Sequence, residues 1–164
     1  MKKVAVVVGS NGKNLVLARA FEEQLRTQGH EVHLVDVVGA QLPLYSPLQY
    51  GKINGAEVMA PFQAALAADA FVFIAPEYNG GLPPALTNFI AWASASAKDW
   101  RAHFNKKRAA IATHSGGDGG QLLVMLRLQL SYIGMTVVGR QININDRKAL
   151  DPATLEDVCA QLLA

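Results

Sequence analysis

Five short apolar runs recur along the chain, and they are rich in Val, Ile and Phe, as β-strands are. They are Val4–Val8, Val32–Val37, Phe71–Ala75, Ala109–Thr113 and Thr136–Ile144. The longer stretches between them place apolar residues three and four positions apart, which is the spacing of an amphipathic helix. Because parallel strands need a crossover that is usually helical, this alternation predicts an α/β domain with a parallel sheet.

Each of the five expected helices has an apolar face. The face-forming residues are Leu15, Ala18, Phe21 and Leu25 in the first helix; Val58, Phe62 and Leu66 in the second; Leu86, Phe89, Ile90 and Ala93 in the third; Leu123, Leu126, Leu130 and Ile133 in the fourth; and Leu155, Val158, Cys159 and Leu162 in the fifth. Gly29 closes the first helix, and Pro83 opens the third. Pro61 is tolerated in the second only near its first turn. Asp151 is the expected N-cap of the fifth helix, with Pro152 at its first position.

The polar residues of two strands predict the order of the sheet. Strands one, three and four are apolar throughout, as strands buried on both faces are. The second contains His33 and Asp36, and the fifth contains Arg140 and Asn143, so both belong at edges. The order 2-1-3-4-5 satisfies this, whereas the other common doubly wound order would bury strand two. We therefore expect a flavodoxin-like three-layer sandwich formed by residues 1–164 as a single domain.

Composition and charge narrow the class of protein. The 164 residues are 51% hydrophobic and 17% charged, which excludes intrinsic disorder. Cys159 is the only cysteine, so an internal disulfide and a thiolate zinc site are excluded. A scattered net charge of +2 gives little support to a nucleic-acid or membrane partner. Neither a secretory core nor a membrane-spanning run is visible, so we expect a cytoplasmic protein.

The loop after strand one, residues 9–14, is a candidate anion site, because it runs directly into a helix. Ligands of doubly wound sheets bind beyond the carboxyl ends of the strands, and a helix N-terminus offers free N–H groups to an anion. Ser10, Asn11 and Asn14 add side-chain donors, and Lys13 adds charge. The loop matches neither a P-loop nor a dinucleotide fingerprint. An ordinary turn with Asn14 as N-cap is the alternative.

The loops after strands three and four are suited to a planar ligand. Residues 76–80, Pro-Glu-Tyr-Asn-Gly, lie in a loop stiffened by proline at both ends, and Tyr78 can cover one face of a polar ring. Four glycines between residues 116 and 120 let the backbone approach a ligand closely. For both loops the alternative is a structural turn without a ligand. His114 and Glu77 are expected to have structural rather than chemical roles.

With these loops the chain resembles the NADPH-dependent FMN reductase family, a flavodoxin-like group that includes bacterial quinone, azo-dye and chromate reductases. The resemblance covers nearly the whole chain, and its most specific part follows strand three. The matching segments are Gly9-Ser10, Leu42-Pro43-Leu44-Tyr45, Ala68-Asp69-Ala70, Pro76-Glu77-Tyr78-Asn79-Gly80, Ser115-x-Gly117 and Leu126-Arg127.

The resemblance implies an FMN-dependent oxidoreductase that takes hydride from NAD(P)H and passes electrons to a small acceptor, such as free flavin or a quinone. The cofactor does this chemistry, so no catalytic side chain and no metal are implied. The implied phosphate site is Ser10, Asn11, Gly12, Lys13 and Asn14; the implied isoalloxazine site is Pro76, Glu77, Tyr78, Asn79 and Gly80, with Ser115, Gly116 and Gly117 nearby. Family members are usually homodimers or tetramers, and we expect a homodimer built on helix faces that carry Trp92, Leu122, Met125 and Tyr132.

The first loop departs from the family pattern. After Gly-Ser-x the family usually has an arginine and then a serine, whereas this chain has Gly12 after Gly9-Ser10-Asn11 and no second serine in the loop. This predicts weaker FMN binding, and it leaves an alternative: a family member that acts as a regulatory or scaffold protein. A flavodoxin-type electron carrier is disfavoured, because such carriers are strongly acidic and this chain has a net charge of +2. A response-regulator receiver is excluded, because Val8 and Gly9 stand where it needs acidic residues.

Overall fold

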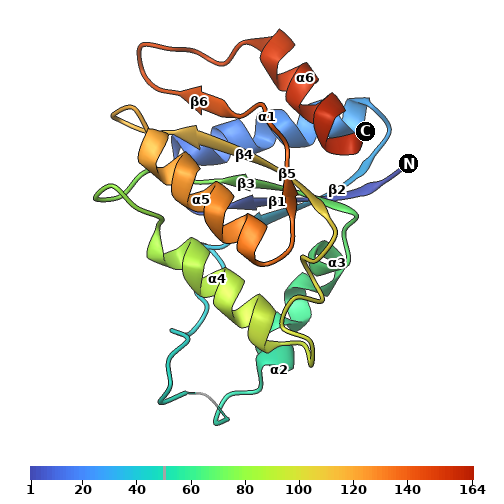
Figure 1. The fold of residues 1–164 in the computed structure, drawn as a ribbon, viewed down its shortest axis with the longest axis vertical. Helices are drawn as coiled ribbons and strands as arrows, with labels where there is room; N and C mark the ends of the chain where they lie inside the picture. The colour runs from blue at the N-terminus through green and yellow to red at the C-terminus, as the bar shows by residue number, and fades with distance from the viewer. Residues whose placement is uncertain (50) are drawn as a thin grey trace.

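A computed structural model describes residues 1–49 and 51–164 (Figure 1). Its parallel sheet has the order β2-β1-β3-β4-β5, and β6 also pairs with β4. The predicted flavodoxin-like strand order is therefore confirmed. The strands are β1 (Lys3–Val8), β2 (Glu31–Asp36), β3 (Ala70–Ile74), β4 (Arg108–His114), β5 (Thr136–Val137) and β6 (Ile142–Ile144).

Helices cover both faces of the sheet and make it the middle of three layers (Figure 1). Alternate residues of β1 point to opposite faces. Val4, Val6 and Val8 pack in one apolar cluster with α1 and α6, while Ala5 and Val7 pack in another with α4 and α5. The helices are α1 (Lys13–Thr27), α2 (Gly55–Met59), the 3₁₀ turn η1 (Ala60–Phe62), α3 (Gln63–Leu66), α4 (Pro84–Ala95), α5 (Gly120–Tyr132) and α6 (Pro152–Leu163).

Two elements differ from the sequence prediction. The second helix is divided into α2, η1 and α3, because Pro61 has no backbone N–H and interrupts the helical hydrogen bonds. The fifth strand is divided into β5, which pairs with the start of β4, and β6, which pairs with its end. Arg127 on α5 holds the intervening backbone by donating to the carbonyls of Val137 (3.2 Å) and Val138 (2.9 Å).

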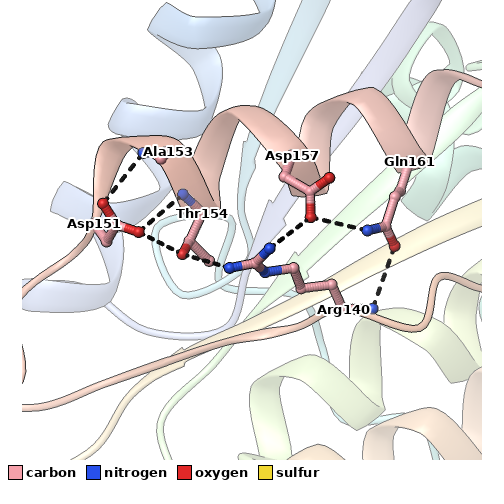
Figure 2. A network of polar contacts seen from close by, with 6 residues as sticks. All are labelled: Arg140, Asp151, Ala153, Thr154, Asp157 and Gln161. Atoms are coloured by element: carbon pink, nitrogen blue, oxygen red, sulfur yellow. Dashed lines mark hydrogen bonds and ion pairs between the residues drawn. The ribbon is translucent and has the colours of Figure 1, made fainter.

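The start of α6 agrees with the prediction and is tied to the β5–β6 connection (Figure 2). The carboxylate of Asp151 accepts from the backbone N–H groups of Ala153 and Thr154 at 3.3 and 3.2 Å. Arg140 donates to Asp157 at 2.9 Å and to the Thr154 hydroxyl at 3.0 Å. The cap and the ion pair together hold α6 beside the edge of the sheet that β5 and β6 form.

Burial separates core residues from candidate interface residues. Cys159 is fully buried, and this burial raises the pKa of its thiol to about 12, in agreement with a core role. Trp92 and Leu122 are also buried, so the prediction that they form a dimer face is wrong. Both belong to the apolar cluster on the face of the sheet that α4 and α5 cover. No helix within residues 1–49 and 51–164 has the length and apolar character needed to cross a membrane.

Candidate functional site

The loops after β1, β3 and β4 all lie at the carboxyl edge of the sheet, on the left in Figure 1. In the first of them, Gly12 is the N-cap of α1 and has a φ of 68°, in the left-handed region that glycine adopts most readily. No side chain caps this helix, and its first turn contains no acidic residue. The 15-residue helix therefore presents uncapped N–H groups and the positive end of its dipole.

Asn14 lies inside the first turn of α1, so the alternative interpretation of it as the N-cap is wrong. Its side chain is buried and bridges to the end of β4. The amide nitrogen donates to the carbonyl of His114 at 2.8 Å, and the amide oxygen accepts from the N–H of His114 at 2.9 Å. Asn14 thus joins the first loop to the third. Ser10 is buried as well, and its hydroxyl donates to the carbonyl of Asn11 at 3.1 Å.

The tip of the second loop is a two-residue turn. Asn79 and Gly80 have φ angles of 51° and 72°, while Tyr78 and Gly81 exchange backbone hydrogen bonds of 3.0 and 2.9 Å. Two successive positive φ angles between such a pair define a type I′ turn, for which Asn-Gly is the preferred sequence. Tyr78 is 48% exposed beside this turn, so its ring is not packed away in the core.

Glu77 holds the second loop against α5 and the third loop. Its carboxylate accepts from the N–H of Leu122 in the first turn of α5 at 3.1 Å. Its own N–H donates to the hydroxyl of Ser115 at 2.9 Å, and that hydroxyl lies 2.7 Å from the hydroxyl of Thr113. A carboxylate at a helix N-terminus is favoured by the helix dipole. These contacts support the expected structural role of Glu77.

The glycines of the third loop serve two purposes. At Gly119 a Cβ would lie 2.9 Å from the Thr113 methyl group, so packing requires glycine there. At Gly116 and Gly117 a Cβ would have open space around it. These two line a hollow of about 610 Å³ together with Asp118, Asn145, Asp146 and Arg147. The open glycines, rather than Gly119, are therefore the ones available to a ligand.

The loop after β6 joins this edge, which the sequence reasoning missed. Asp146 forms an ion pair with Lys13 of the first loop and lies 3.4 Å from Nε2 of His114. The available signal was the polar run Asn145-Asp146-Arg147-Lys148 directly after the last strand. The general rule for this topology places ligands at the loops after strands one, three and four, which adjoin the switch point. The rule therefore gave no reason to include the loop after the last strand. Splitting the fifth strand brings the end of β6 beside the end of β4.

The long connection after β2 is fixed to α4. The carbonyl of Pro43 accepts from the Trp92 indole at 2.6 Å and from the Asn88 amide at 3.0 Å. The N–H of Tyr45 donates to Asn88 at 2.8 Å, and the Tyr45 ring meets Trp92 edge-on. The Leu-Pro-Leu-Tyr segment is therefore anchored on the helix that follows the second loop. Tyr50, which lies in the same connection, is outside the described residues.

Comparison with known proteins agrees with this architecture. Residues 2–149 match the family model described as NADPH-dependent FMN reductase. The chain is 38% identical over 96 residues to a 2-hydroxy-1,4-benzoquinone reductase of a Burkholderia species, covering 56% of this chain and 50% of that relative. It is 30% identical over 137 residues to an NAD(P)H-dependent FMN reductase of Pseudomonas aeruginosa, covering 82% of this chain and 71% of that relative. The chain thus spans half the length of the Burkholderia relative.

Solved structures of flavoproteins share the fold of this chain. The flavoenzyme NAD(P)H:(acceptor) oxidoreductase of Paracoccus denitrificans superimposes with a TM-score of 0.71 and 26% sequence identity. The superposition covers 85% of this chain and 76% of that one. At 18% identity and a TM-score of 0.64, a flavodoxin of Pseudomonas aeruginosa shares the fold alone.

Proposed function

This chain belongs to the NADPH-dependent FMN reductase family, and from that membership we propose that it is an FMN-dependent oxidoreductase. It uses NAD(P)H to reduce a small acceptor, with quinones and free flavins as the favoured classes. The observation that carries the proposal is the family match over residues 2–149, because this range contains all three loops that meet at the carboxyl edge of the sheet. Nothing in the described residues, 1–49 and 51–164, favours a purely regulatory or scaffold role.

The first loop fits the phosphate of FMN by its chemistry. The uncapped N-terminus of α1 offers backbone N–H donors and a positive dipole end, and Lys13 stands at its first position. No carboxylate lies in the first turn of the helix. Ser10 and Asn11 flank these donors, whereas the amide of Asn14 is engaged with His114. We propose that the backbone of residues 10–13 provides the main phosphate contacts.

The second and third loops fit the isoalloxazine. A type I′ turn uses the N–H groups of its flanking residues, which leaves those of Asn79 and Gly80 free to face a ring edge. Tyr78 offers a half-exposed aromatic face, and Gly116 and Gly117 leave room for close approach of a ring. Pro76 and Glu77 fix the loop, and Ser115 holds Glu77 in place.

The chain's own residues bind and orient, while FMN, when bound, supplies hydride acceptance and electron transfer. The rigid turn at Asn79 presents its N–H groups without reorganisation, which favours charge that develops on a ring edge. Tyr78 excludes water from one face of the ring. The hydrogen bonds from Asn88 and Trp92 to Pro43 keep the long connection beside the site, where it can border the acceptor.

We propose assembly as a homodimer through α5, with residues 1–164 acting as one FMN-binding domain. Exposed apolar side chains line one face of this helix: Val124, Met125, Leu128 and Tyr132. Met125, Leu128 and Tyr132 line a largely apolar hollow of about 530 Å³ together with Leu82 and Gln129. Monomeric proteins rarely leave such a continuous apolar face in water. Because the reaction consumes NAD(P)H, we also propose a cytoplasmic location.

Flavin titration with NAD(P)H turnover tests the proposed function. Loss of one charge-assisted phosphate contact costs about 1.5–3 kcal/mol, or roughly a 10- to 150-fold weaker affinity. We therefore expect FMN binding in the micromolar range, with a smaller preference over riboflavin than in relatives that keep the arginine and serine. NAD(P)H oxidation should require added FMN and increase with a quinone.

Two outcomes would contradict parts of this proposal. Absence of fluorescence quenching at about 100 μM FMN, which corresponds to binding free energies weaker than about −5.5 kcal/mol, would overturn the flavoenzyme assignment. A yellow protein that keeps FMN through dialysis would instead show that the loss of the arginine and serine from the first loop does not weaken binding.

A further inference from the structure

Three charged or polar side chains from separate segments meet beside the first loop. Lys13 opens α1, His114 ends β4, and Asp146 lies in the loop between β6 and α6. The Lys13 ammonium donates to a carboxylate oxygen of Asp146, and Nε2 of His114 lies 3.4 Å from the same oxygen. Asp146 also lines the hollow that Gly116 and Gly117 border. The carboxylate therefore contacts the proposed phosphate loop, and its residue borders the hollow beside the third loop.

The loop that carries Asp146 has its own support. Asn145 and Lys148 exchange backbone hydrogen bonds of 3.1 Å, and the Asn145 side chain accepts from the N–H groups of Arg147 and Lys148 at 2.9 and 3.0 Å. This turn keeps the backbone of residue 146 in position without the ion pair. A change of the Asp146 side chain should therefore alter its charge without unfolding the loop.

The ion pair with Asp146 cancels the positive charge of the first loop. Lys13 is the only cationic residue among residues 9–14. Its hydrogen bond and charge hold the pKa of Asp146 below the ordinary range, so the carboxylate is ionised at neutral pH. An ionised Asp146 neutralises the one cation that the first loop offers to a phosphate. It also adds a negative charge near the uncapped end of α1.

We propose that Asp146 is a specificity-determining residue, which competes with the phosphate of FMN for Lys13 and thereby lowers the preference of the site for FMN over riboflavin. The inference rests on the proposed function, which supplies a phosphorylated flavin as the ligand. Both partners of the ion pair are largely exposed, with 62% and 67% of their side chains accessible. Exposed pairs are weak, so the phosphate can displace Asp146 at a modest cost in affinity.

The test is the substitution Asp146→Asn, which keeps the size of the side chain and removes its charge. FMN and riboflavin are each titrated into purified protein, with flavin fluorescence quenching as the measurement. We expect the dissociation constant for FMN to fall about fivefold, a modest factor because the ion pair is exposed. The dissociation constant for riboflavin, which has no phosphate, should not change.

Two further variants separate competition from a change in net charge. Glu156→Gln removes an exposed carboxylate from α6 and should leave both affinities unchanged. In a Lys13→Gln background, Asp146→Asn should lose most of its effect on FMN, because the cation for which the two anions compete is absent. If Asp146→Asn tightened FMN binding just as much in that background, the proposal that Asp146 competes with the phosphate for Lys13 would be wrong.

The outcomes also separate this inference from the proposed function. If the parent protein binds both flavins and Asp146→Asn changes neither affinity, or tightens both equally, the inference is wrong and the proposed function stands. If neither the parent protein nor the variant binds any flavin, the proposed function fails and the inference falls with it.

Discussion

Side chains at the site of this protein mainly hold its loops to one another. Asn14 joins the first loop to His114, and Ser115 joins the third loop to Glu77. Glu77 in turn caps α5 through the N–H of Leu122. A buried polar group is costly to leave without a partner, so each of these contacts resists loss. The polar side chains set the position of the backbone groups that would contact a flavin.

The Ser115 hydroxyl should therefore be important for stability. Ser115→Ala leaves the N–H of Glu77 without its acceptor in a buried setting, and we expect a loss of about 1–3 kcal/mol in the free energy of unfolding. Urea denaturation measures this loss. Ser131→Ala, at an exposed position of α5, is the matched control and should be near neutral. Equal stability of the two variants would show that Glu77 finds another acceptor.

The cap of α6 should contribute to stability only while Asp151 is ionised. The hydrogen bond from the Thr154 hydroxyl, aided by the N–H of Ala153, lowers the pKa of Asp151 from its ordinary value of 3.8. A lowered pKa means that the folded state favours the ionised form. The contribution is thus complete above pH 3.8 and is lost as the pH falls through the folded-state pKa.

Thermal melts of Asp151→Ala test this cap. At neutral pH we expect a Tm lower than that of the parent protein by about 2–4 °C. Below pH 3.8 the difference should shrink, because the parent protein also loses its ionised cap. Glu156→Ala, which removes an uninvolved carboxylate from the same helix, serves as the control. A difference that is constant with pH would show that the cap does not depend on charge.

The elements of this fold obey local backbone rules with few exceptions. Pro61 divides one predicted helix into three short pieces, and Arg127 stabilises the break between β5 and β6. The Asn79-Gly80 turn is the local feature with the greatest bearing on function. Its positive φ angles close the turn through Tyr78 and Gly81, so the N–H groups of Asn79 and Gly80 take no part in those two hydrogen bonds. The element, more than any side chain in it, defines the proposed ring contact.

Substitutions at Asn79 separate the backbone of this turn from its side chain. Asn79→Pro cannot adopt the φ of 51° and also removes the N–H group. We expect FMN-dependent NAD(P)H oxidation to fall by at least about tenfold, or 1.4 kcal/mol in activation free energy. Asn79→Gly keeps the turn conformation and should retain most activity. Comparable activity in the two variants would place the ring contact elsewhere.

At the scale of the whole molecule, the two helical layers have different surfaces. The α5 face carries neighbouring exposed apolar side chains, among them Val124, Leu128 and Tyr132. Trp100 lies against Tyr132, with their ring centroids 5.9 Å apart, and extends this surface. On α1, on the opposite side of the sheet, Val16 is the one exposed large apolar side chain, and the apolar hollow that it borders with Ala20 and Leu150 is smaller, at about 240 Å³. The asymmetry supports a dimer that uses α5.

Sedimentation velocity should show a dimer for the parent protein at micromolar concentration. Leu128→Asp introduces a charge at a 72% exposed position of the proposed interface and should give a monomer. Val16→Asp makes the same kind of change at a 70% exposed position on the other side of the sheet and should leave the dimer intact. A monomeric parent protein would rule out this interface under these conditions.

Local sequence determined the elements of this protein and their order. Runs of Val, Ile and Phe specified β1 and β3, and an alanine-rich apolar run specified β4, as strands buried on both faces. The polar residues of β2 placed that strand at an edge. Asp151 specified the start of α6. These features were predictable because strand burial, helix caps and chain connectivity depend on residues close together in the sequence.

Only the tertiary structure decided which polar groups meet across the loops. Asn14 could cap a helix or bridge to another loop, and its burial beside His114 selected the bridge. Asp146 lies 133 residues from its partner Lys13, so no local pattern could reveal the pair. Trp92 became core rather than interface because Pro43 and Tyr45, in the connection after β2, contact its ring. Leu122 packs in the same apolar cluster. Long-range packing sets these contacts, because the residue type at a position does not specify which distant residue will lie beside it in the folded chain.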